Sequence, residues 1–307
     1  MRLFVGAYAA FPPGDETGGD QLIEALTRNE GVTGLELPFL GELKPHPAWR
    51  SDWRHVVTDI PGTAGHNATD PTFGLASTDG AGRAAALAFA RDLHRDVRAL
   101  AASGVQVEAV ELHSAPSGRA NPGALVASLR EINDWEWGQT RLMIEHCDAS
   151  TANHRGEKDF LPFAAELASV AEAARWAGGE RWGLSLNWGR SAIEGRDAGV
   201  ALSHIEQACA AGLLSALFFS SASGSRTEFG GPWVDRHLPP RGLPFSPEGS
   251  LLGGEQIRAA LMAAGDVPIV GVKFGFRPDA LPAEERAERL ALSLALVARS
   301  AGLARSQ

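Results

Sequence analysis

The sequence is poor in cysteine, in basic residues and in long apolar runs. Its two cysteines, Cys147 and Cys209, are too few for a disulfide framework and suit a reducing cytoplasm. No clustered Cys/His spacing accompanies them, so we expect no tightly held structural zinc. No apolar run approaches the ~20 residues that a membrane span needs. With 28 Lys and Arg against 37 Asp and Glu, the net charge of −9 argues against a nucleic-acid partner, because phosphate contacts require a basic face.

The glycine-rich pattern G-x-G-x-x-G of dinucleotide-binding folds is also missing after the first apolar run. Short β-like runs nevertheless recur along the chain. We expect eight strands, at residues 3–9, 34–38, 55–60, 107–113, 141–146, 182–187, 213–219 and 268–274. That number suits a closed barrel, and no linker divides the chain. The sequence therefore predicts an α/β fold, a single (β/α)8 TIM-barrel domain over residues 1–307.

Helical segments alternate with these runs. Residues 82–104, 157–179 and 197–212 are rich in alanine and carry apolar side chains at helical spacing. Strands that alternate with helices form a parallel sheet. In such barrels the site is built at the carboxyl ends of the strands, which is where we looked for chemistry.

The predicted strand ends are unusually polar. They carry Glu36, Asp59, Glu111, His113, Glu145, His146, Asn187, Arg190, Ser220, Ser221, Lys273 and Arg277. Two long connections follow strands, at 61–80 and 220–253, and we expect both to lie at the carboxyl-terminal face as lids or binding loops. A contact between copies in a homo-oligomer is their alternative role.

Residues 141–150, RLMIEHCDAS, raise a question of direction. Side chains alternate along a strand, so Glu145 and Cys147 share one side while His146 and Asp148 share the other. The pattern leaves open which side faces the barrel axis. A carboxylate is easier to place at the barrel mouth than against the helices, which favours Glu145.

The order of VELHSAP (110–116), IEHCDA (144–149) and LSLNWGR (184–190) resembles the xylose isomerase-like TIM barrels, and most of all their uncharacterised bacterial members. In that superfamily a His often closes the fourth strand, a Glu of the fifth binds a divalent metal, and the sixth ends in Asp-x-x-His. By this resemblance His113 and Glu145 match, whereas Asn187 and Arg190 stand at the Asp-x-x-His positions. A divalent metal (Mg, Mn or Zn), held by Glu145, His113 and Asn187, is the cofactor that the resemblance implies.

The departures from that pattern weaken the metal site. The family usually supplies a second Glu from the eighth strand and a His from the seventh, but this sequence has Lys273 and FFSSASG (218–224) there. Lys273 and Arg190 would repel a cation. We therefore expect Lys273 to replace the positive charge of the metal beside Glu145, or to form an imine with a carbonyl substrate. A plain buried ion pair between the two strands is the alternative.

The resemblance implies a sugar isomerase or epimerase that abstracts a proton from a small polyhydroxylated carbonyl substrate. Glu145 or Glu36 would be the base, and Lys273, Arg190 or a metal would polarise the oxygen. The candidate substrate-binding residues are His113, Asn187, Arg190, Trp188, His146, Trp233 and Arg236. Two alternatives stay open: a glycoside hydrolase-like enzyme that pairs Glu36 with Glu145, and a non-catalytic sugar-binding barrel that has lost the family metal.

Overall fold

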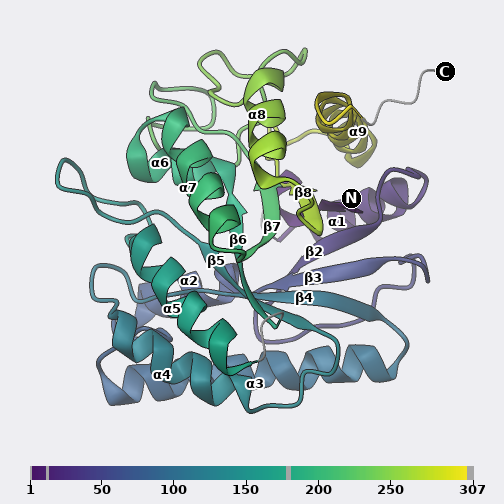
Figure 1. Cartoon of the computed structure of the whole chain (residues 1–307). Coiled ribbons are helices and arrows are strands. Elements are labelled where there is room, and N and C mark those ends of the chain that lie inside the picture. The colour runs from purple at the N-terminus through teal and green to yellow at the C-terminus, as the bar shows by residue number, and fades with distance from the viewer. Residues whose placement is uncertain (1, 12–13, 178–180, 303–307) are drawn as a thin grey trace.

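Eight parallel strands close into a barrel in the computed structural model, which describes residues 2–11, 14–177 and 181–302 (Figure 1). Each strand pairs with the next, and β8 returns to pair with β1. The strands are β1 (Arg2–Val5), β2 (Gly34–Pro38), β3 (Arg54–Thr58), β4 (Gln106–Leu112), β5 (Arg141–His146), β6 (Trp182–Asn187), β7 (Leu214–Phe219) and β8 (Ile269–Val272). The predicted (β/α)8 TIM barrel is confirmed.

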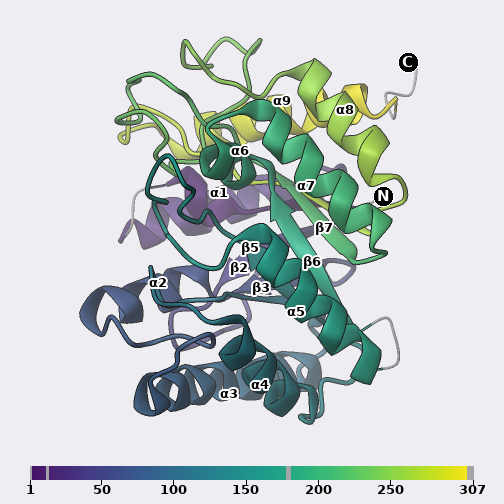
Figure 2. The same ribbon diagram turned by 60° about the vertical axis from the view of Figure 1, so that its left-hand side comes forward.

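Helices pack around the outside of the barrel (Figures 1 and 2). They are η1 (Ala7–Ala10), α1 (Glu16–Thr27), α2 (Ile60–Thr69), α3 (Gly80–Ala102), α4 (Pro122–Asn133), α5 (Phe163–Trp176), α6 (Trp188–Gly195), α7 (Ala198–Ala210), α8 (Gly254–Ala264) and α9 (Ala283–Ser300). Several begin at side-chain caps: Asp79 accepts hydrogen bonds from the first turn of α3, and Asp197 does so for α7. Among the described residues no helix is long and apolar enough to cross a bilayer.

The barrel interior is apolar in its lower part and polar toward the mouth. The apolar part is a buried cluster of Phe4, Val56, Ala109, Met143, Ala216, Phe218 and Ile269. The polar layer above it holds Glu36, Glu111, Glu145 and Lys273. Because side chains two positions apart share a face, the layer above Met143 holds Glu145, and the layer above Ala109 holds Glu111. The open question of direction is thereby answered: Glu145 faces the axis and His146 faces the helices.

The two long connections both reach the mouth of the barrel, but they differ in structure. Half of the first is helical, because residues 60–69 form α2, with a proline in its first turn. The second, 220–253, has no helix or strand of its own and is held by isolated bridges such as Ser221 to Leu238. Residues from both line one cavity above the strand ends.

Candidate active site

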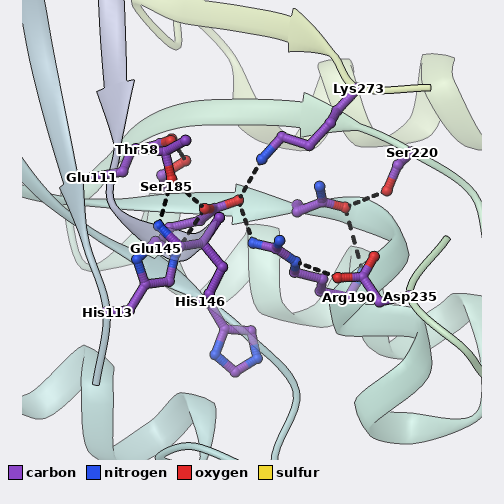
Figure 3. Close-up of polar contacts among 12 residues, drawn as sticks. Thr58, Glu111, His113, Glu145, His146, Ser185, Arg190, Ser220, Asp235 and Lys273 are labelled. Atoms are coloured by element: carbon purple, nitrogen blue, oxygen red, sulfur yellow. Dashed lines mark hydrogen bonds and ion pairs between the residues drawn. The ribbon is translucent and has the colours of Figure 1, made fainter. Parts of the chain in front are cut away.

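Glu145 is the centre of the polar layer (Figure 3). It is fully buried, and its Oε1 forms an ion pair with Arg190 Nη1 at 2.6 Å and accepts a hydrogen bond from Lys273 Nζ at 3.1 Å. Its Oε2 lies 2.8 Å from His113 Nε2 and 3.3 Å from Thr58 Oγ1. Burial alone would raise the pKa of Glu145, but the charges of Arg190 and Lys273 outweigh burial and hold that pKa well below its usual range. Glu145 is therefore an ionised carboxylate.

Lys273 joins two carboxylates across the barrel. Its Nζ lies 2.6 Å from Glu36 Oε1 as well as 3.1 Å from Glu145 Oε1. Burial opposes its charge, yet the two glutamates raise the pKa of Lys273 well above its usual value. The close approach needs a glycine at position 6, because a Cβ there would lie 2.5 Å from Glu36 Oε2. Lys273 is thus a fixed cation at the barrel axis.

A protonated carboxyl group lies beside this ion pair. Burial raises the pKa of Glu111 well above its usual value, and the neighbouring charge of Glu145 adds to the effect. Burial also raises the pKa of Glu36, with Lys273 opposing it. Oxygens of Glu36 and Glu111 lie within 4.8 Å of each other, and Ser185 Oγ donates to Glu111 Oε1 at 2.5 Å. The site therefore holds a proton on a carboxyl group a few ångströms from an ionised one.

His113 is a second fixed cation. Its Nδ1 lies 2.5 Å from Asp59 Oδ1, while its Nε2 contacts Glu145. Burial would lower the pKa of His113, but Asp59 raises it well above the usual value. The imidazolium therefore donates to both carboxylates and fixes one face of Glu145.

Arg190 is positioned by the start of α6. Asn187 caps this helix, because its Oδ1 accepts from the backbone of Gly189 at 3.0 Å and from Ser220 Oγ at 2.6 Å. Arg190, in the first turn, then reaches Glu145 with Nη1 and Asp235 Oδ2 with Nε at 3.0 Å. The same amide that stands at the predicted metal-ligand position thus aims the arginine.

A cavity of about 410 Å³ opens above the polar layer, and Tyr8 and Arg190 are among the residues that line it. The Tyr8 ring lies 5.6 Å from Lys273 Nζ, and its hydroxyl is buried without a hydrogen-bond partner among the described residues. The lining includes five Lys and Arg side chains against two Asp, and the pKa of His237, lowered by burial to about 3, leaves that ring neutral. The cavity is positively charged.

A larger hollow, of about 830 Å³, lies at the opposite end of the barrel, where Trp135, Trp137 and Trp176 line it. It faces the segments that precede β5 and β6, far from the polar layer. We therefore place the candidate site at the smaller cavity.

The predicted site residues do not all meet here. Glu36, Glu145, Lys273, His113 and Arg190 converge on the polar layer, and Arg236 lines the cavity. Asn187 lies beside this layer and caps α6. The other three, His146, Trp188 and Trp233, lie elsewhere. The ring of His146 is turned away from Glu145, toward the helices (Figure 3).

The two tryptophans predicted to bind substrate also lie outside the cavity. Trp188 is buried in the outer hydrophobic core between strands and helices, so its ring is not free to stack on a sugar. Trp233 packs in the 220–253 loop, close to Gly224, and is not part of the cavity lining. We do not carry His146, Trp188 or Trp233 forward as substrate-binding residues.

The protein-family comparison matches residues 4–289 to a family described as "Domain of unknown function (DUF4862)". The chain belongs to this family. A relative of the DUF4862 chain is "Uncharacterized protein STM3670" from Salmonella typhimurium, 34% identical over 275 residues, which cover 85% of this chain and 84% of the relative.

Solved structures similar to this DUF4862 chain share its fold at low identity. The IolI protein with a bound zinc atom is 13% identical, with a TM-score of 0.64, covering 98% of this chain and 99% of that one. YcjR from E. coli, a 3-keto-D-glucoside 4-epimerase, is 13% identical, with a TM-score of 0.60 and coverage of 95% and 98%. The fold is that of the xylose isomerase-like TIM barrels, as the sequence resemblance predicted.

The residues at the barrel centre do not fit the divalent metal that this fold implies. Oxygens of Glu36, Glu111 and Glu145 lie within 4.8 Å of one another, as ligands would. However, Lys273 Nζ bridges the carboxylates of Glu36 and Glu145, and Arg190 contacts the same Glu145 oxygen as Lys273 does. The Asn187 oxygen is engaged in capping α6. Internal cations therefore occupy the contacts of Glu145 that a metal would need.

The sequence analysis gave no role to four contributors to the site. Glu111 and Asp59 were listed only among the strand-end residues, and Tyr8 and Asp235 were not singled out. Glu111 precedes His113 by two positions, and that shared face was a usable signal. Asp59 was noted only as a strand end. Tyr8 was hidden because residues 3–9 were predicted as one strand, whereas 7–10 form a 3-10 helix. Asp235 lies in a loop that has no regular spacing of apolar residues, so no pattern in the sequence points to it.

Proposed function

We propose that this protein is an isomerase or epimerase that abstracts a proton beside the carbonyl group of a small polyhydroxylated substrate. The observation that carries the proposal is the group of buried carboxyl groups at the barrel centre next to fixed cations, where burial raises the pKa of Glu111 and the charges of Arg190 and Lys273 lower the pKa of Glu145. Enolisation needs a base, an acid and a positive charge at the oxygen that becomes negative. All three are supplied by side chains.

The acid and base roles follow from the pKa directions. Glu145, whose pKa is held low, is a weak base and mainly anchors Arg190 and Lys273. Burial raises the pKa of Glu36, which makes this glutamate the stronger base, because a catalytic base works best with a pKa near the working pH. Glu111 carries the proton that is returned to the substrate. Glu36 therefore takes the proton and Glu111 supplies one.

The oxygen of the substrate is polarised by a cation. Lys273 and Arg190 are already desolvated and held by carboxylates, so they need no reorganisation as charge develops on an enediolate oxygen. The unpartnered hydroxyl of Tyr8 can donate to a second substrate oxygen. YcjR, named as a sugar epimerase, shows that a barrel of this fold hosts related chemistry.

The cavity indicates the class of substrate. Five cationic side chains against two carboxylates favour a substrate with a carboxylate or phosphate as well as hydroxyl groups. Arg236 is the exposed member that forms no ion pair within the described residues. Arg236→Gln should weaken binding of a sugar acid or sugar phosphate roughly tenfold, as measured by calorimetry, and leave a neutral sugar unaffected. Arg258→Gln, on the exposed face of α8, is the matched control.

The test of the reaction is deuterium exchange. Neutral sugars, keto sugars, sugar acids and sugar phosphates are incubated with the protein in D2O, and exchange beside the carbonyl is followed by NMR. Glu36→Gln and Glu111→Gln should each abolish exchange and keep binding. A ligand that binds in the cavity without exchange, whether or not Mg²⁺, Mn²⁺ or Zn²⁺ is added, would instead support a non-catalytic sugar-binding barrel.

The glycoside hydrolase alternative has less support. Its two carboxyl groups must flank a glycosidic bond, with separations of roughly 5 Å or 6.5–9.5 Å. Here Lys273 Nζ lies between Glu36 and Glu145, 2.6 and 3.1 Å from their oxygens, and fills that space.

A further inference from the structure

A second cluster of titratable side chains lies behind the barrel wall, between β5, α6 and α7. It consists of His146, Glu194 and His204, all buried. One ligand atom from each lies within 4.8 Å of the other two. The ring of His146 points away from Glu145, and Glu194 and His204 lie on α6 and α7, outside the strands of the barrel (Figure 3). The cluster therefore has no direct part in the proposed reaction.

The spacing of the three ligand atoms suits a tetrahedral ion. His146 Nε2 lies 3.1 Å from Glu194 Oε2, and His204 Nε2 lies 3.8 Å from Glu194 Oε1. Zinc bonds of ~2.0–2.1 Å place neighbouring ligand atoms roughly 3.3 Å apart, between these two distances. Despite its closeness to Glu194, His146 Nε2 is not aligned for a hydrogen bond and has no other partner among the described residues. A buried ring nitrogen is thus left facing a carboxylate and a second imidazole.

The outer contacts of each ligand are those that a metal site requires. His146 Nδ1 lies 2.6 Å from the buried carboxylate of Glu166, and His204 Nδ1 lies 3.1 Å from Ser191 Oγ. Partners of this kind fix the tautomer so that Nε2 points to the ion. Glu194 Oε2 in turn accepts from a backbone N–H at 2.9 Å. All three ligands are oriented before any ion binds.

We infer that His146, Glu194 and His204 bind one divalent cation of the zinc class, with water as the fourth ligand. Two imidazoles and a carboxylate form a set that zinc accepts. The proposal departs from the expectation drawn from Cys/His spacing. The three ligands are scattered along the sequence, and only the packing of α6 and α7 against β5 brings them together.

The ion would fix the relative position of two elements of the candidate active site, β5 and α6. His146 directly follows Glu145 on β5, and Glu194 lies one turn after Arg190 on α6. A bond from each to one ion ties the strand that carries the carboxylate to the helix that carries its arginine. The competing occupant is a proton, which would leave His146 as an imidazolium between Glu166 and Glu194.

The test is metal uptake by tag-free protein that has been dialysed against a chelator. One equivalent of Zn²⁺ should bind, and Co²⁺ should give the visible absorption bands of a tetrahedral site. His204→Gln and Glu194→Gln should each weaken Zn²⁺ affinity at least tenfold. Glu111→Gln, which alters the carboxylate cluster at the barrel centre, is the matched control and should leave affinity unchanged.

Two results would overturn the inference. One is the absence of Zn²⁺ uptake by the native chain. The other is an equivalent that His204→Gln retains and Glu111→Gln loses, since the ion would then sit at the barrel centre. Circular dichroism of each variant in chelator checks folding. The Co²⁺ spectrum of the native protein provides a separate test that needs no variant. A spectrum with six-coordinate bands alone would contradict a site with three protein ligands and one water.

Discussion

At the scale of single residues, Lys273 defines the site. The partner expected from the sequence, Glu145, is present at 3.1 Å, and Glu36 is an additional partner at 2.6 Å. The positions of Lys273 and Glu145 near predicted strand ends were enough to place both at the same end of the barrel, because parallel strands all end on one side. It was not enough to find the second carboxylate contact, which depends on the register of β2 and β8 on either side of β1.

Replacing Lys273 by methionine should destabilise the fold. The change leaves Glu36 without its cation in a buried site and removes one of two cations from Glu145, so we expect a loss of about 3–5 kcal/mol in the free energy of unfolding. Urea denaturation measures it. Adding Glu36→Gln to the variant should recover part of the loss. Unchanged stability would mean that the pair contributes nothing, and Lys44→Met, at an exposed pair, is the control.

Lys273 should not form an imine. Its two carboxylates raise the pKa well above the usual value despite burial, so the amine is protonated and lacks the lone pair that attacks a carbonyl. Borohydride added to the protein with aldehyde or keto sugars should therefore leave the intact mass unchanged, as mass spectrometry would show. A mass increase that disappears in Lys273→Met would replace charge stabilisation by covalent catalysis.

At the scale of elements, the start of α6 connects fold to function. The sequence predicted the end of β6 at Asn187 correctly but read the amide as a metal ligand in place of an aspartate. In the structure the amide oxygen caps α6, and its Nδ2 has no hydrogen-bond partner within the described residues. The distinction could not be drawn from sequence, because capping and metal ligation use the same oxygen.

The capping role predicts an asymmetry between two substitutions. Asn187→Ala removes the acceptor and should cost about 1 kcal/mol of unfolding free energy, with looser positioning of Arg190. Asn187→Asp keeps the capping oxygen and replaces the unpartnered NH2 group by a second carboxylate oxygen, so it should lose less stability than Asn187→Ala does. Denaturant titration of both variants measures this. Equal losses in the two would argue against the cap.

At the scale of the whole molecule, the sequence predicted the fold better than the site. Each predicted β run overlaps one strand of the barrel, because buried parallel strands leave continuous apolar signatures. Closure followed from the count and the alternation. The contacts of Asp235 and Tyr8 could not be predicted from the strand count or the alternation. Asp235 lies on an irregular loop, and Tyr8 lies on the 3-10 helix that follows a first strand shorter than predicted.

The last prediction concerns acid stability. His55, on β3, is buried in the outer core, and its ring packs 4.3 Å from the ring of Trp49. Burial lowers the pKa of His55 to about 4 from its ordinary 6.5. The unfolded chain therefore binds a proton at a higher pH than the folded chain does. The contribution of neutral His55 to the free energy of unfolding is therefore complete above pH 6.5 and is lost as the pH falls toward 4.

Between pH 7 and pH 5, His55 alone should lower the free energy of unfolding by about 2 kcal/mol. In His55→Phe the ring still packs on Trp49 but cannot take up a proton, so its unfolding free energy should fall less between pH 7 and pH 5 than that of the native protein, by about this amount. Urea titrations at the two pH values measure the difference. His66→Asn, at an exposed histidine, should leave the native slope unchanged. If His55→Phe and the native chain lose stability in parallel, a buried neutral His55 is not what makes the barrel sensitive to acid.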